Sequence, residues 1–448
     1  MIQGVIERYE DDQLVVAISD LAVVRGALTD LPVGEQDVDP SPELGLALLT
    51  LQDVASGAAE LRARDSGLEE RVKEAKRPAG SPKGIKPSHL DILIFWLREH
   101  FRSAYDGWIP TIGKNRVIDP VRGLPYLGGG SDGNPHFGGY GDPKTSSAAN
   151  GGTSVGPHPE AAPPGWPQRA AYPGRGVRVG VLDTQLYPNE WLAGGYLATA
   201  DDLLQIPVAG HPPFPATAGH ATFIAGLILR QAPGAELVVR PVLNEQALGS
   251  AWYVAKQMAG FIGSGVDILN LSFGCYTDDG EPPLVLARAV SLISAEILLV
   301  AAAGNHGNVD KLRKRGVPKN GSWAKGLTPK TPVWPAAFDE VIAVGATDGD
   351  RLAKFSPQTP WVDVTAPGVN VESTYLTGEV KLGAPRARGE ARFSNGFARW
   401  DGTSFAAATV SGAVAAKIQP GRCDARQALA YICEEPGGEI RPFVKPDR

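Results

Sequence analysis

Four residues that lie far apart in the sequence together have the chemistry of an acyl-transfer site: Asp183, His220, Asn305 and Ser404. A histidine can take the proton of a serine hydroxyl, and a buried carboxylate can hold the imidazole in the required tautomer. An asparagine amide, with the serine backbone N–H, can hydrogen-bond the oxyanion that forms at the attacked carbonyl. We therefore predict Ser404 as nucleophile, His220 as base, Asp183 as its orienting acid and Asn305 as oxyanion donor.

These residues lie at the ends of expected strands and helices. Short apolar runs, which we interpret as strands, cover 177–183, 236–243, 266–274, 297–305 and 341–347. Asp183 and Asn305 end two of these strands, whereas His220 and Ser404 each precede an apolar helical stretch. Continuously apolar strands that alternate with helices predict an α/β fold, a parallel sheet with helices on both faces. Because working groups gather beyond the carboxyl ends of such strands, we expect the four residues to meet there.

The segments around these residues resemble those of the subtilisin-like serine proteases, the subtilase family. The family's motifs are an apolar strand ending in Asp-Thr-Gly, then His-Gly-Thr-His-Val-Ala-Gly, then Gly-Thr-Ser-Met-Ala-Ala-Pro. The corresponding segments here are 181–185 (Val-Leu-Asp-Thr-Gln), 220–226 (His-Ala-Thr-Phe-Ile-Ala-Gly) and 402–408 (Gly-Thr-Ser-Phe-Ala-Ala-Ala). The resemblance covers about residues 177–418 and implies a subtilisin-like sheet and serine endopeptidase activity. Gln185, Ala221, Phe223 and Ala408 depart from the family pattern, but none of these departures removes a catalytic group.

The same resemblance extends to substrate binding. Asn305 falls in an Ala-Gly-Asn stretch like the family's oxyanion segment, and residues 270–274 resemble the strand that lines the substrate pocket. It therefore implies that polypeptide substrates bind extended beside Ser272, Phe273 and Gly274, pairing main chain with main chain.

Two other function classes remain open at this point. The first is a catalytically silent protein that keeps the subtilisin fold and serves as a binding or scaffold protein. The second is a lipase or esterase, which is disfavoured because Ser404 lies in Gly-Thr-Ser rather than in a Gly-x-Ser-x-Gly elbow.

Composition changes divide the chain into five expected parts. Residues 1–82 form a small α+β N-terminal domain, either regulatory or propeptide-like, and 83–126 form a helix and connecting segment. Residues 127–176, rich in glycine and proline, form a linker or draped arm; 177–435 form the peptidase domain and 436–448 a C-terminal tail.

Within the N-terminal part we expect two short strands joined by a turn at Glu10–Asp12 and helical structure over 42–77. Ser88 and Asp91 form a capping box that predicts the start of a helix.

Charge and composition limit the partners. The 448 residues carry a net charge of -6, which argues against nucleic-acid binding, and the N-terminal domain is a candidate site for a protein partner. The first twenty residues include four acids where a secretory signal needs apolar residues, and no apolar run approaches the roughly 18 residues of a membrane span. Three cysteines are typical of a reduced compartment, so we expect a cytoplasmic protein without membrane contact.

The remaining charged segments have two interpretations each. The acidic pairs Asp201–Asp202 and Asp278–Asp279 could bind calcium, as many members of the family do, but we favour solvated loop carboxylates, with no metal site and no required cofactor. The basic segment 307–332 either guides an acidic substrate to the site or is a solvated loop.

Overall fold

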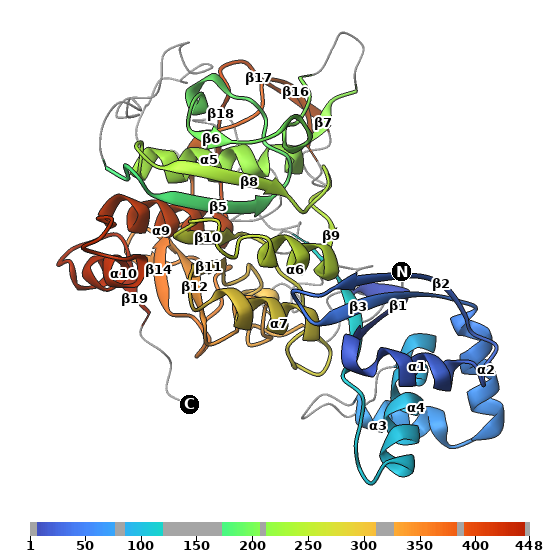
Figure 1. Cartoon of the computed structure of the whole chain (residues 1–448). Helices are drawn as coiled ribbons and strands as arrows, with labels where there is room; N and C mark the ends of the chain where they lie inside the picture. The colour runs from blue at the N-terminus through green and yellow to red at the C-terminus, as the bar shows by residue number, and fades with distance from the viewer. Residues whose placement is uncertain are drawn as a thin grey trace.

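The computed structural model describes residues 7–76, 86–119, 173–206, 212–310, 327–382 and 389–443. Most of the expected Gly/Pro-rich segment, up to residue 172, and residues 311–326 of the basic segment lie outside these ranges. The described chain contains two units that share an interface, an N-terminal unit (7–119) and a larger unit (173–443) (Figure 1).

The larger unit is built on the expected parallel sheet. Its strands lie in the order β6 (Tyr196–Leu197), β8 (Glu236–Pro241), β5 (Arg178–Asp183), β10 (Ile268–Leu271), β11 (Leu298–Ala302), β12 (Val341–Asp348) and β14 (Val364–Pro367), all parallel. Two short antiparallel strands complete it, β13 (Arg351–Leu352) beside β12 and β19 (Arg441–Pro442) beside β14. The strand β19 lies within the expected C-terminal tail.

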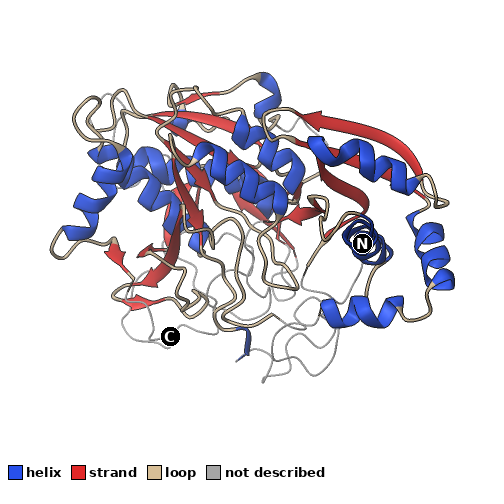
Figure 2. Cartoon of the chain, turned by 60° about the horizontal axis from the view of Figure 1, so that its bottom comes forward, coloured by secondary structure: helices blue, strands red, loops and turns tan. Residues whose placement is uncertain are grey.

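Helices cover both faces of this sheet (Figure 2). One face packs against α5 (His220–Gln231), α9 (Thr403–Lys417) and α10 (Ala425–Glu434), the other against α6 (Ala251–Ala259) and α7 (Leu284–Ile293). Along β11, Leu298 and Val300 lie in the first core, whereas Leu299 and Ala301 lie in the second. A strand with a core on both sides must be apolar at every position, which explains the continuous runs in the sequence.

Two smaller strand groups complete the described part of the larger unit. The strands β15 (Val371–Thr374) and β18 (Phe397–Trp400) pair antiparallel, and β16 (Gly378–Leu382) pairs with β17 (Gly389–Phe393) and β7 (Phe214–Pro215). The short β9 (Gly249–Ser250) joins the sheet of the N-terminal unit instead.

The N-terminal unit is an antiparallel sheet with helices on one face. Its strands are β1 (Tyr9–Ala17), β2 (Gly34–Ser41), β3 (Leu46–Gln52) and β4 (Ile112–Ile118), in the order β2-β3-β1-β4-β9. Its helices are α1 (Leu21–Leu28), α2 (Val54–Arg64), α3 (Leu68–Ala75) and α4 (His89–Ala104). The capping box at Ser88 and Asp91 is present at the start of α4, as the sequence predicts.

Two expectations for this unit are wrong. Residues 44–52 are not helical, because β3 is buried on both faces: Leu46 and Leu48 pack toward the larger unit, Leu49 and Leu51 toward the helices. The resulting run of leucines lacks the alternation that marks a half-buried strand. The acids Glu10–Asp12 form no turn either, since they lie within β1, where the register with β4 shifts.

The two units share one apolar core. The sheet face that carries Val15, Leu46 and Ile118 packs against α6 and α7 in the same cluster as Trp252 and Met258. Polar contacts run along the same interface: Asp39 on β2 accepts hydrogen bonds from Trp252 Nε1 (2.7 Å) and Lys256 Nζ (2.8 Å). The N-terminal unit is therefore tied to the helices beside the site rather than merely connected in sequence.

Candidate active site

The carboxyl end of β5 brings the predicted acid and base into contact. Asp183, the last residue of β5, has no exposed surface, and His220, the first residue of α5, is 4% exposed. The imidazole Nδ1 lies 2.8 Å and 2.9 Å from the two carboxylate oxygens. Because a carboxylate only accepts, Nδ1 carries the proton, which leaves Nε2 as the proton acceptor of the neutral ring.

Neighbouring groups fix this pair. Asp183 Oδ1 also accepts from the backbone N–H of Thr184 (2.8 Å), and Thr184 Oγ1 accepts from the N–H of Ala221 in the first turn of α5 (3.1 Å). The His220 ring makes an edge contact with the Trp400 ring at a centroid distance of 5.7 Å. Gln185, which departs from the family pattern, points elsewhere, since its amide donates to the carbonyl of Asp201 (2.9 Å).

The predicted oxyanion donor contacts Thr403, the residue before the predicted nucleophile. Asn305 follows β11, and its Oδ1 accepts from the N–H (3.0 Å) and the hydroxyl (3.1 Å) of Thr403, the first residue of α9. Thr403 Oγ1 in turn accepts from the N–H of Gly304 (3.1 Å), whose φ of +108° favours glycine. Since Oδ1 is held by Thr403, the Nδ2 donor of Asn305 lies on the side of Gly402, two residues before Ser404.

Ser404 itself makes reciprocal hydrogen bonds with Ser272. Its Oγ donates to the carbonyl of Ser272 (3.2 Å), and Ser272 Oγ donates to the carbonyl of Ser404 (3.0 Å). Behind them, Asn270 Nδ2 donates to Ser272 Oγ (2.9 Å), and Ser411 Oγ donates to Asn270 Oδ1 (3.0 Å). All of these side chains are buried, so the nucleophile is held against the strand expected to bind substrate.

That strand already has a main-chain partner. Asp119, which follows β4, donates its N–H to the Gly274 carbonyl (3.0 Å) and accepts the Gly274 N–H (2.8 Å). Phe273, between Ser272 and Gly274, is fully buried in the core shared by the two units. A chain segment of the N-terminal unit thus occupies the edge at Gly274 that we expected a substrate to use.

Two buried side chains lie next to the site without a predicted role. His306 Nε2 lies 3.0 Å from the Thr331 carbonyl, so Nε2 carries the proton and Nδ1 receives the Tyr276 hydroxyl (3.4 Å). Burial lowers the pKa of His306 to about 4, so its ring is neutral at physiological pH. Burial likewise raises the pKa of Cys275 to about 12, which leaves its thiol protonated and unreactive.

The acidic pairs have different environments. Asp202 Oδ2 accepts from the N–H and hydroxyl of Thr199 (both 2.7 Å), whereas Asp278 is buried against the N-terminal unit and corrects our expectation of a solvated carboxylate. Within the described ranges, no group of three His, Cys, Asp or Glu side chains is arranged to hold a metal ion.

The sequence analysis missed Thr403 and Asp119, and it assigned Asp278 the wrong environment. Thr403 had a signal, since it lies between Gly402 and Ser404 in a segment already singled out. Asp119 and Asp278 had none, because their partners Gly274 and Glu7 lie 155 and 271 positions away in sequence.

Comparisons with known proteins agree with the motifs. A model of the subtilase family matches residues 174–423. The chain is 33% identical over 214 residues to a thermostable alkaline protease of Halalkalibacterium halodurans. The aligned region covers 45% of this chain and 50% of that protein. It is 32% identical over 255 residues to subtilisin Savinase of Lederbergia lenta (54% of this chain, 76% of that protein).

Two further similarities are of the same kind. An intracellular serine protease of Paenibacillus polymyxa is 31% identical over 271 residues, 57% of this chain and 69% of that protein. The crystal structure of a lanthipeptide protease aligns with 60% of this chain and 84% of its own, at 24% identity and a TM-score of 0.43. The chain thus spans half the length of the thermostable alkaline protease and about two thirds or more of the others named here.

Proposed function

The chain belongs to the subtilase family, and from this premise we propose that it is a serine endopeptidase in which Ser404 is the nucleophile. The observation that carries the proposal is the buried pair of His220 and Asp183, joined at 2.8 Å, at the sheet end that also receives Asn305. The carboxylate fixes the Nδ1–H tautomer, and only that tautomer offers Nε2 as a base.

In the proposed reaction, the Ser404 hydroxyl turns from the Ser272 carbonyl toward His220 and attacks the scissile carbonyl while Nε2 takes its proton. The negative oxygen is stabilised by Asn305 Nδ2 and by the Ser404 N–H at the N-terminus of α9. The C–N bond breaks as His220 returns the proton to the departing amine. A water molecule, deprotonated by the same nitrogen, then hydrolyses the acyl-enzyme and restores Ser404.

The substrate in this proposal is an extended polypeptide. Its main chain would pair with Ser272 and Gly274, whose carbonyls currently accept from Ser404 and Asp119. Substrate binding therefore displaces both partners, and the displaced Ser404 hydroxyl becomes available to His220. The reaction needs neither a cofactor nor a metal ion, so we propose none.

We propose further that the N-terminal unit regulates the site by occupying this edge. Asp119 makes both hydrogen bonds that an antiparallel substrate strand would make with Gly274. The unit is held there by the shared core and by Asp39, so occlusion is its resting condition. A protein partner, expected from the sequence, would meet its outer surface and promote release.

We also propose an intracellular location. The cysteines Cys275, Cys423 and Cys433 are all free thiols, which suits a reducing compartment, and one relative is named an intracellular serine protease. None of the described helices is long and apolar enough to cross a membrane.

Hydrolysis of an unfolded protein substrate at pH 8 tests the proposal. Ser404→Ala should lower the rate by several orders of magnitude without changing the melting temperature, since only one hydroxyl is lost. Ser291→Ala, on the exposed surface of α7, serves as the matched serine control and should keep the wild-type rate. Equal hydrolysis by the Ser404 variant would refute the assignment and leave the silent binding protein as the better hypothesis.

A further inference from the structure

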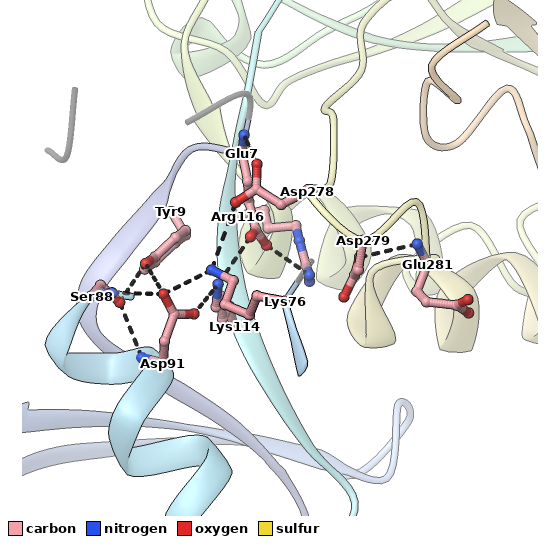
Figure 3. A network of polar contacts seen from close by, with 10 residues as sticks. All are labelled: Glu7, Tyr9, Lys76, Ser88, Asp91, Lys114, Arg116, Asp278, Asp279 and Glu281. Carbon is pink, nitrogen blue, oxygen red and sulfur yellow. Dashed lines mark hydrogen bonds and ion pairs between the residues drawn. The ribbon is translucent and has the colours of Figure 1, made fainter. Parts of the chain in front are cut away.

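The loop that follows the occluded edge enters a buried ionic cluster of the N-terminal unit. Asp278 lies four residues beyond Gly274, and its side chain is 1% exposed. Its Oδ1 accepts the backbone N–H of Glu7 (3.2 Å), and its Oδ2 lies 3.6 Å from Lys76 Nζ (Figure 3). Among the described residues, Oδ2 has no hydrogen-bond partner.

The cations of this cluster are already engaged by other acids. Lys114 contacts Glu7 (2.9 Å) and Asp91 (2.6 Å), Arg116 contacts Glu7 (2.8 Å), and Lys76 contacts Asp91 (2.8 Å) (Figure 3). All of these groups belong to the N-terminal unit, so among the described residues Asp278 is the carboxylate of the cluster that the larger unit supplies. Its contact with Lys76, at 3.6 Å, is longer than the other ion pairs given above, and the Glu7 carboxylate is a neighbour. An ionised Asp278 is therefore poorly compensated in this position.

We propose that Asp278 is a proton-dependent lock, which holds the N-terminal unit on the Gly274 edge while it is protonated and releases that edge when it ionises. The control of substrate access by this lock rests on the proposed function. The contact itself involves no catalytic residue. Asp278 and Gly274 belong to one five-residue stretch, so an outward movement of Asp278 pulls directly on the Asp119 pairing.

The electrostatics give the direction of the switch. Burial, and then the charge of Glu7, raises the pKa of Asp278 to about 6 despite Lys76 and Lys114. In the released state the solvated carboxyl has its ordinary pKa of about 4, so docking takes up a proton. Docking is therefore strongest below about pH 4 and weakens as the pH rises through about 6. The two-unit difference allows a change of about 100-fold in the ratio of docked to released edge.

The other facing groups keep their charge over this range. Burial would raise the pKa of Glu7, but Arg116 and Lys114 outweigh it and lower that pKa. Burial would lower the pKa of Lys76, but Asp91 and Glu7 raise it. Lys114 and Lys76 hold the pKa of Asp91 well below its usual range against the effect of burial. Of these groups, Asp278 is thus the one that titrates between pH 4 and 7.

Amide hydrogen exchange on the full-length chain tests the lock without requiring activity. The variant Asp278→Asn is neutral at every pH, and the matched control Asp279→Asn alters the exposed neighbour. All proteins carry Ser404→Ala, and the peptides followed are those spanning 112–119 and 268–276. At pH 5, midway between the two pKa values, we expect wild type and Asp279→Asn to exchange about 10-fold faster than Asp278→Asn. At pH 8 the wild type and Asp279→Asn should exchange up to about 100-fold faster than Asp278→Asn.

Two results would overturn the lock: equal protection of wild type and Asp278→Asn at pH 8, or no change in wild-type protection between pH 5 and 8 after correction for intrinsic rates. Peptide hydrolysis by the proteins that retain Ser404 is measured in parallel, as the ratio of the wild-type rate to the Asp278→Asn rate. Effects of pH on the catalytic groups, which both proteins share, cancel in this ratio. If the exchange pattern appears but none of these proteins hydrolyses peptide, the proposed function fails and the lock stands.

Discussion

Asn115 offers the sharpest test of occlusion by the N-terminal unit. This fully buried residue of β4 reaches across the interface to the start of α6 in the larger unit. Its Oδ1 accepts the N–H of Trp252 (2.9 Å), and its Nδ2 donates to Ser250 Oγ (3.2 Å) and to Gln13 Oε1 (2.6 Å). One unit thus supplies a helix cap to the other.

The variant Asn115→Ala removes this cap. Loss of a capping acceptor costs about 1 kcal/mol, and loss of the second hydrogen bond across the interface about 1 kcal/mol more. The docked state should therefore lose about 2 kcal/mol relative to the released state, a shift of roughly 30-fold in their ratio. Wherever the released fraction is small, the rate of peptide hydrolysis rises by the same factor.

The assay is hydrolysis of a fluorogenic peptide by full-length protein, with Gln13→Ala as the matched control. Gln13 contacts Asn115 from β1, so its removal breaks a bond inside the N-terminal unit and none to the larger unit. We expect Gln13→Ala to keep the wild-type rate. If Asn115→Ala folds, shows a cooperative melting transition and yet hydrolyses peptide no faster than wild type, the N-terminal unit does not limit access to the site.

Three further predictions follow from individual contacts. Thr403→Val keeps the side-chain shape but removes one of the two donors to Asn305 Oδ1. We expect kcat to fall roughly tenfold with little change in KM, because the amide of Asn305 is then less well positioned. An unchanged kcat would show that Thr403 does not position this amide. In Gly226→Ala the new Cβ would lie 2.3 Å from Ser373 Oγ. This clash should lower the free energy of unfolding, measured by chemical denaturation, by about 1–3 kcal/mol. A variant as stable as wild type would contradict the close packing of α5 on β15. The lowered pKa of Asp91 contributes stability above about pH 4 that is lost as the pH falls. Between pH 7 and pH 3 the free energy of unfolding in urea should therefore fall more for wild type than for Asp91→Asn. Equal decreases would argue against the buried ion pairs.

The sequence predicts the larger sheet well because its strands are short, apolar and separated by helices. Each strand carries its own signal, and the rule that parallel strands align their carboxyl ends then places Asp183 near Asn305 without knowledge of any contact. The contact between Asp183 and His220 agrees with that expectation, since both residues lie at element ends.

The N-terminal unit is less predictable because its strands depend on the larger unit. The sequence of β3 is interpreted as helical because one face of this strand is covered by α6 and α7, which lie far along the chain at Ala251–Ala259 and Leu284–Ile293. The same holds for Asp278. Its sequence neighbours are typical of a solvated loop, and it is buried by contacts with Lys76 and Glu7, which lie far away in the sequence. No local pattern encodes such a contact.

Fluorophosphonate labelling followed by intact-mass measurement tests the central claim most directly, because an activated serine reacts with this probe whatever its natural substrate. We use Asn115→Ala, in which the edge at Gly274 should be more accessible, with and without Ser404→Ala. We expect one covalent adduct per chain on Asn115→Ala and none when Ser404 is also replaced. An adduct that persists without Ser404, or a released edge with no adduct at all, would contradict a serine endopeptidase built on Ser404, His220 and Asp183.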